Sequence, residues 1–156
     1  MPIKPQTLRE PSQPSTFDLL LSTIPAMRQM PRREIKVLKR EPYSLCLKQM
    51  GDVLHDDEPI ETVTCAISAS RGRGVLVMTD RRLVLITLRT GTCDWSLSEL
   101  DGVRGRAAKF TLPAAIYLDT PGGTIVIVVG DGPVWGPQFT EAVRGAHARQ
   151  PLAQAA

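Results

Sequence analysis

The sequence predicts a mainly β protein: a seven-stranded, antiparallel, partly open barrel capped by a C-terminal α-helix and preceded by a helix and a Pro-rich basic arm. Two apolar runs, Val75–Thr79 and Leu83–Leu88, are separated by three residues, which is the pattern of an antiparallel hairpin. More short apolar runs follow, and one amphipathic stretch of helical periodicity comes after them. Short antiparallel strands leave edges exposed, and a nearly closed barrel with a helix across its opening covers most of them.

Residues 1–40 are predicted to form a flexible, Pro-rich, basic arm. Seven prolines within the first 42 residues exclude one long helix or a sheet there. Residues 1–54 carry nine Lys or Arg against five Asp or Glu, so the formal net charge of +3 comes from the N-terminal third. For the basic segment that ends at Arg40 we expect a solvated linker, and contact with anionic lipid or with phosphate backbones is the alternative. Its candidate contact residues are Arg32, Arg33, Lys36, Lys39 and Arg40.

A short amphipathic helix is predicted within this arm, near residues 16–24. Phe17, Leu20, Leu21 and Ile24 have the spacing of one apolar helix face, and a proline follows directly. A helix of about two turns is marginal in water, so it needs a surface to lie on. We expect it to dock on its own domain, and the alternative is docking in a groove of a partner protein.

The folded domain is predicted to span residues 41–149 and to begin with a helix over 42–54. Pro42 suits the first helical position, where the missing N–H costs nothing. An apolar stripe then follows at helical spacing, and Gly51 weakens the pattern only slightly. The stripe consists of Tyr43, Cys46, Leu47, Met50 and Val53 or Leu54.

The barrel is expected over residues 60–130. Its first strand alternates apolar and polar residues, which is typical of a half-buried strand. Pro113 places the beginning of the sixth strand at an edge or a bulge. The seventh strand, 125–129, is apolar at every position, so we expect both of its faces to be buried. The seven predicted strands are 61–69, 75–79, 83–88, 93–97, 103–110, 112–119 and 125–129.

The capping helix is predicted over residues 137–148. Its apolar positions recur at helical spacing and form one continuous stripe, which must be buried, and the open end of the barrel is the nearest surface. Residues 150–156 are expected to be disordered. The stripe consists of Trp135, Phe139, Ala142, Val143 and Ala146.

The order of a helix, seven short strands and a last amphipathic helix resembles the pleckstrin-homology (PH) superfold. The segment from Arg73 to Ile86, with Thr-Asp-Arg-Arg-Leu between two apolar runs, is similar to the second and third strands of bacterial PH-like domains. The resemblance covers roughly residues 55–148. It implies a binding scaffold rather than an enzyme, with protein interaction, oligomerisation or membrane-surface association as its role.

The resemblance also suggests candidate contacts in two loops. Arg71 and Arg73 occupy the loop that carries the basic residues for phosphoinositide headgroups in lipid-binding relatives, so they are candidates for anion binding. The other interpretation of these two arginines is a solvated hairpin loop. Arg81 and Arg82 form the next turn with Asp80, and there we expect a structural role first and a partner-binding patch as the alternative. A carboxylate such as Asp94 or Glu99 is the expected partner of Arg82.

The sequence favours a protein without catalytic chemistry. It has no GxSxG, HExxH or GxxxxGK[ST] pattern, and no pair of cysteines or histidines has metal-binding spacing. Cys46, Cys65 and Cys93 are odd in number and widely spaced, which is typical of reduced, cytosolic thiols. We therefore expect no catalytic residue, no metal and no cofactor.

These observations predict a non-catalytic, PH-like adaptor module in the cytoplasm, free or peripheral to the membrane. An unidentified protein is the first expected partner, an anionic membrane surface is the second, and strand addition at an edge could give homo-oligomers. Association with nucleic acid through the basic arm is the alternative function.

Overall fold

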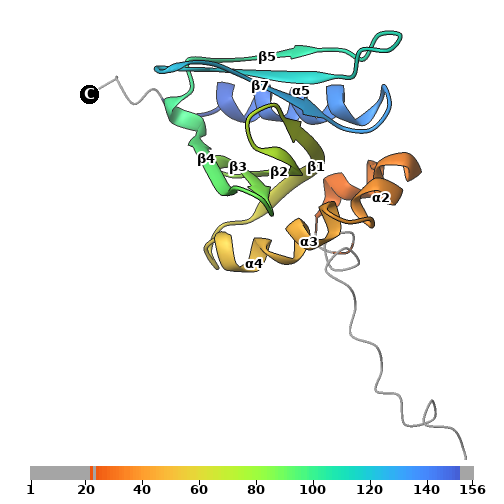
Figure 1. Ribbon diagram of the computed structural model, residues 1–156. Helices are drawn as coiled ribbons and strands as arrows, with labels where there is room; N and C mark the ends of the chain where they lie inside the picture. Colours follow the sequence, from red (N-terminus) through yellow and green to blue (C-terminus); the bar gives the residue numbers. More distant parts are fainter. Residues whose placement is uncertain (1–21, 23, 152–156) are drawn as a thin grey trace, which may run out of the picture.

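The computed structural model describes residue 22 and residues 24–151. Seven strands form one antiparallel sheet in the order β4–β3–β2–β1–β7–β6–β5, and this sheet curves round on itself (Figure 1). No strand pairing joins β4 to β5, so the barrel is partly open, as the sequence predicts. The strands are β1 Ile60–Ser68, β2 Gly72–Thr79, β3 Arg82–Thr87, β4 Gly91–Ser96, β5 Gly102–Arg106, β6 Ala115–Thr120 and β7 Gly123–Val129.

The C-terminal helix lies between the two halves of the curved sheet (Figure 1). Phe139 and Val143 of this helix are buried in a core that the inward side chains of β2, β3, β6 and β7 complete. The approach is close: a Cβ atom on Gly105 of β5 would lie 2.7 Å from the Thr140 methyl group. The helices are η2 Pro25–Gln29, α2 Arg32–Leu38, α3 Tyr43–Lys48, α4 Met50–Val53, η3 Leu97–Glu99 and α5 Trp135–Ala148.

A second core lies on the outer face of β1–β3, where the N-terminal helices cover the sheet (Figure 1). Successive side chains of a strand point to opposite faces. On β2, Val75 and Val77 therefore face the N-terminal helices, while Leu76 and Met78 face the barrel interior. Both sets are buried, which explains why β2 and β3 are apolar without alternation.

The expectation of a flexible arm is wrong for residues 24–40. This segment forms η2 and α2, and four of its apolar side chains are buried in the outer core. They are Ile24, Met27, Met30 and Leu38. The predicted docking residues Phe17, Leu20 and Leu21 lie outside the described residues, as do residues 152–156 of the predicted tail.

Several predicted boundaries also differ from the structure. The single helix expected over 42–54 is two short helices that meet at Gln49. The fifth strand ends at Arg106 instead of residue 110, and the sixth begins at Ala115, after Pro113. The prediction that both faces of the seventh strand are buried is wrong for the outer face. Val126 is 44% exposed there because no helix covers the outer side of β7.

The N-terminal helices should be required for the stability of the whole domain. Leu38 is fully buried under the sheet, so Leu38→Ala should lower the free energy of unfolding by about 2–5 kcal/mol, measured by urea denaturation. The matched control, Val126→Ala on the uncovered face of β7, should cost less than about 1 kcal/mol. Equal losses for the two variants would contradict a structural role for α2.

Candidate functional site

The candidate site depends on one buried carboxylate, that of Glu34 in α2. Glu34 is 0% exposed. One of its oxygens accepts hydrogen bonds from the Cys65 N–H at 2.7 Å and from the Thr64 hydroxyl at 3.1 Å. The other oxygen accepts the Asp131 N–H at 2.7 Å. Glu34 therefore joins α2 to strand β1 and to the loop between β7 and α5.

Glu34 sits where β1 and β7 separate. Their pairing is confined to Ala66–Ser68 and Ile127–Val129, which leaves the first half of β1 without a strand on that side. The Glu34 carboxylate accepts the Cys65 N–H there, and the Trp135 indole N–H donates to the Val63 carbonyl at 3.0 Å. Burial raises the pKa of Glu34, and the hydrogen bonds that it accepts oppose this rise.

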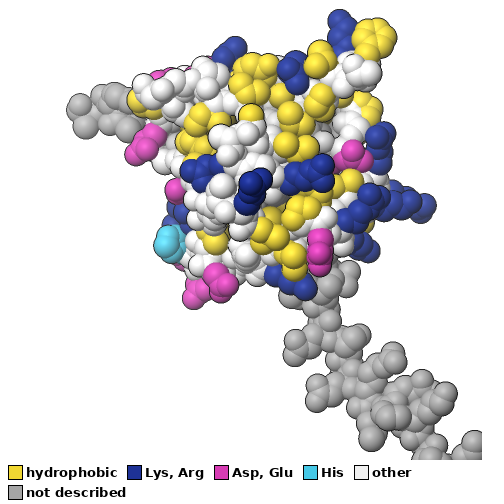
Figure 2. Space-filling view, in the orientation of Figure 1, with side chains coloured by type: hydrophobic (Ala, Val, Ile, Leu, Met, Phe, Trp, Pro, Cys, Tyr) yellow, Lys and Arg dark blue, Asp and Glu magenta, His cyan; other side chains and the backbone are white. Residues whose placement is uncertain are grey.

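This attachment fixes which side of α2 faces solvent. Arg32 and Lys36, four residues apart on the helix, are exposed, and neither has a side-chain partner among the described residues. Arg33 is instead paired with Asp131 at 3.1 Å, and the two side chains are 66% and 40% exposed. Figure 2 shows Lys and Arg side chains gathered along the edge that α2 forms. We call the exposed cations of this segment the basic surface of α2: Arg28, Arg32, Lys36, Lys39 and Arg40.

Of the loop arginines predicted from the sequence, Arg73 lies on the same side of the sheet as these helices. Arg73 has the strand parity of Val75, so its side chain points to the outer face. Burial raises the pKa of Tyr43 in α3, and the charge of Arg73 opposes the rise, which places Arg73 near α3. The sequence analysis missed Arg89, which is exposed in the β3–β4 loop. That loop adjoins Arg71, because the Thr90 hydroxyl donates to its carbonyl at 3.4 Å.

The turn between β2 and β3 has a structural function through Arg82. Its guanidinium donates to both oxygens of Glu58, at 2.7 and 2.8 Å, and to Asp94 at 3.0 Å. The Thr79 hydroxyl also donates to Glu58, whose side chain is 0% exposed. Hydrogen bonding to Arg82 lowers the pKa of Glu58 to about 2 despite its burial. Asp94 was one of the expected partners, whereas Glu58 was not foreseen.

Arg81 of the same turn remains more accessible. It pairs with Asp80 at 3.1 Å and with Asp57 at 3.8 Å, and its side chain is 46% exposed. Such exposed pairs are worth little in stability, so Arg81 is available to a partner in a way that Arg82 is not.

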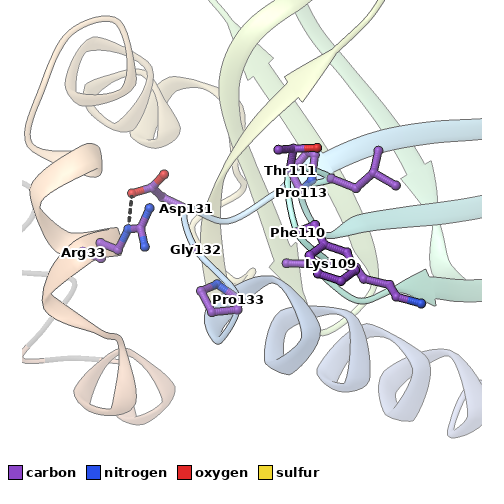
Figure 3. Close-up of a pocket in the computed structure, with 10 residues that line it drawn as sticks. Arg33, Lys109, Phe110, Thr111, Pro113, Asp131, Gly132 and Pro133 are labelled. Carbon is purple, nitrogen blue, oxygen red and sulfur yellow. Dashed lines mark hydrogen bonds and ion pairs between the residues drawn. The ribbon is translucent and has the colours of Figure 1, made fainter.

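An open pocket of about 460 Å³ lies beside α2 (Figure 3). Arg33 and the Asp131–Pro133 loop form one side, and the hairpin between β5 and β6 forms the other. The hairpin carries Phe110 at its tip, and this residue is 99% exposed. The lining residues are Arg33, Ala108, Lys109, Phe110, Thr111, Leu112, Pro113, Asp131, Gly132 and Pro133.

Two of the described thiols and one imidazole have structural surroundings. Burial raises the pKa of both Cys46 and Cys65, so both are thiols near neutral pH. The His147 ring lies 2.7 Å from the Leu100 carbonyl and joins α5 to the corner after η3. Across the described ranges, no three His, Cys, Asp or Glu side chains are grouped to hold a metal ion. None of the helices in that part has the length and apolarity to cross a bilayer.

Comparison with known proteins gives no family: no family model matches the sequence, and no curated protein matches it. Solved structures are similar in shape. The N-terminal PH domain of Vps36 aligns with a TM-score of 0.51 and 15% identity, over 61% of this chain and 83% of that one. The C-terminal domain of an unknown protein from Leishmania infantum aligns with a TM-score of 0.52 and 18% identity, over 65% of this chain and 94% of that one.

The chain has a PH-like fold. Both sequence identities are low, so these similarities show the fold and do not indicate a ligand. Within this PH-like domain, residues 24–54 add the second core on the outer face of β1–β3. The resemblance to bacterial PH-like domains stays a prediction.

Replacing Glu34 by Gln should destabilise the protein. An amide has one acceptor oxygen, and its NH2 group would face an N–H donor that the carboxylate now satisfies. Glu34→Gln should therefore lower the free energy of unfolding by about 1–3 kcal/mol in urea denaturation. Glu141→Gln, in an exposed pair with Arg144, is the control and should change it by less than about 0.5 kcal/mol.

The Glu58–Arg82 pair should produce a measurable acid dependence. The pKa of Glu58 falls from 4.5 to about 2 on folding, so the folded protein binds this proton less tightly than the unfolded chain does. The stability that the ionised pair contributes is thus full above pH 4.5 and is lost as the pH falls toward 2. In urea denaturation, the free energy of unfolding of Glu58→Gln should be well below that of the parent at pH 7. The two values should converge as the pH falls from 4.5 toward 2. Parallel pH profiles would contradict the assignment.

Proposed function

We propose that this chain is a non-catalytic binding module that attaches to an anionic partner through the basic surface of α2 and the neighbouring loop arginines. The observation that carries the proposal is the Glu34 attachment, which holds α2 rigidly with Arg32 and Lys36 outward. Like charges four residues apart on a helix repel one another, and an anionic partner removes that cost. The PH-like fold, which is typical of binding domains, supports the same conclusion.

The partner class is defined by its charge: an acidic protein surface or an anionic membrane. The barrel leaves other surfaces for a second contact, which is the arrangement of an adaptor. The proposed cytoplasmic location and the proposed homo-oligomers rest on the sequence and on β4 as an edge strand. Nucleic acid is the alternative partner and enters the test below as one of the probes.

Charge reversal on α2 tests the proposal. Three probes are mixed with the full chain at low salt: vesicles containing phosphatidylserine, poly-glutamate and a DNA duplex. Each cation near an anionic surface contributes about 1 kcal/mol, so Arg32→Glu with Lys36→Glu should weaken binding of the preferred probe at least roughly thirty-fold. Binding of the parent should also fall as salt is added.

The control is a second double variant with the same change in net charge on another helix. Arg144→Glu with Arg149→Glu alters an exposed residue of α5 and the exposed residue that follows it, and should leave binding within about two-fold of the parent. Equal loss in both double variants would mean that net charge alone drives binding, and no binding of any probe would refute the proposed function. Preference for DNA with a steep salt dependence would favour the alternative partner.

A further inference from the structure

The hairpin between β5 and β6 presents an aromatic side chain to solvent without any contact that holds it. Lys109 and Leu112 pair across the hairpin, with both backbone hydrogen bonds at 2.8 Å, which leaves Phe110 and Thr111 as the turn. Phe110 has φ 54°, in the left-handed region that glycine or asparagine occupies at lower cost. Its 99% exposure means that folding gains nothing from this ring. A partner that takes this ring out of water would therefore gain the whole of its burial energy.

Other apolar side chains extend this exposed tip. Leu112 is 53% exposed in the same hairpin, and Val134, at the beginning of α5, is 50% exposed. Pro133 and Phe110 line one pocket, so the hairpin and the β7–α5 loop lie side by side (Figure 3). We call these residues the apolar tip: Phe110, Leu112, Pro113, Pro133 and Val134.

Two cations lie close to the apolar tip, and one of them, Arg33, is paired with Asp131. Lys109 is exposed beside Phe110, and Arg33 lines the pocket from the opposite wall. The hairpin and α2 lie on the same side of the molecule in Figure 1, and Arg33 of α2 lines the same pocket as Phe110. Asp131, the acidic residue in the pocket lining, is already paired with Arg33.

We infer that this end of the molecule docks on an anionic lipid bilayer, with Phe110 inserted at the boundary between headgroups and acyl chains. This inference rests on the proposed function and names its partner. A bilayer takes up a protruding ring without a preformed socket, while its phosphates face the flanking cations. An acidic protein would need a cavity matched to the ring, and a DNA duplex offers phosphates with no apolar layer beneath them.

Vesicle sedimentation of the full chain tests the inference. Phe110→Ser should reduce partitioning onto vesicles of phosphatidylcholine and phosphatidylserine about ten-fold or more, because it removes the inserted ring and no charge. Val126→Ser, an exposed valine on the outer face of β7, is the matched control and should bind like the parent. Both variants should unfold near the parent's urea midpoint, since neither side chain is buried.

Fluorescence gives an independent measurement of insertion. Phe110→Trp should be quenched on the same vesicles when their acyl chains are brominated, and more strongly than the parent, whose Trp135 is buried and whose Trp95 is partly buried on β4. Unchanged partitioning of Phe110→Ser, or no added quenching of Phe110→Trp, on vesicles that the parent binds would overturn the inference and leave the proposed function standing. Equal loss of poly-glutamate binding in Phe110→Ser would also overturn it. If the parent protein bound none of the anionic probes, both this inference and the proposed function would be refuted.

Discussion

The structure depends on covering both faces of β1–β3. Each face carries a row of apolar side chains, and a sheet that is apolar on two sides is stable in water only between two layers. Helix α5 covers the inner face, as in a PH-like barrel, and the segment from Ile24 to Leu54 covers the outer one. Residues 24–54 are therefore part of the fold, and their orientation follows from the same packing.

Glu34 makes this packing specific. Apolar contacts alone would allow α2 to slide along the sheet, whereas three hydrogen bonds to one carboxylate require a single position. Burial of the carboxylate is costly, and the cost is offset here because it accepts the Cys65 and Asp131 N–H groups where β1 and β7 separate. The exposed cations of α2 are thus held on a rigid element. A rigid charged surface binds at a lower entropic cost than the same charges on a mobile chain.

Two surfaces with different chemistry meet at one end of the molecule. The basic surface of α2 attracts anions at a distance, and the apolar tip around Phe110 acts only on contact. Their joint placement is a property of the fold: 77 residues separate Arg33 from Phe110 in the sequence, yet both line one pocket. The loop that carries Arg71 and Arg73 contributes no residue to this pocket. The proposed bilayer contact therefore does not require that loop.

The sequence by itself determined the seven strands, the hairpin at Asp80 and the last helix, because the spacing of apolar residues within a short segment is a local property. Only the tertiary structure decided the position of residues 24–40. Met27, Met30 and Leu38 have helical spacing, but Glu34 interrupts their stripe, and a charged residue there predicts a solvated segment. Its hydrogen-bond partners lie 30, 31 and 97 residues further along the chain. No local pattern encodes contacts at such separations, so a buried carboxylate and an exposed one look the same in the sequence.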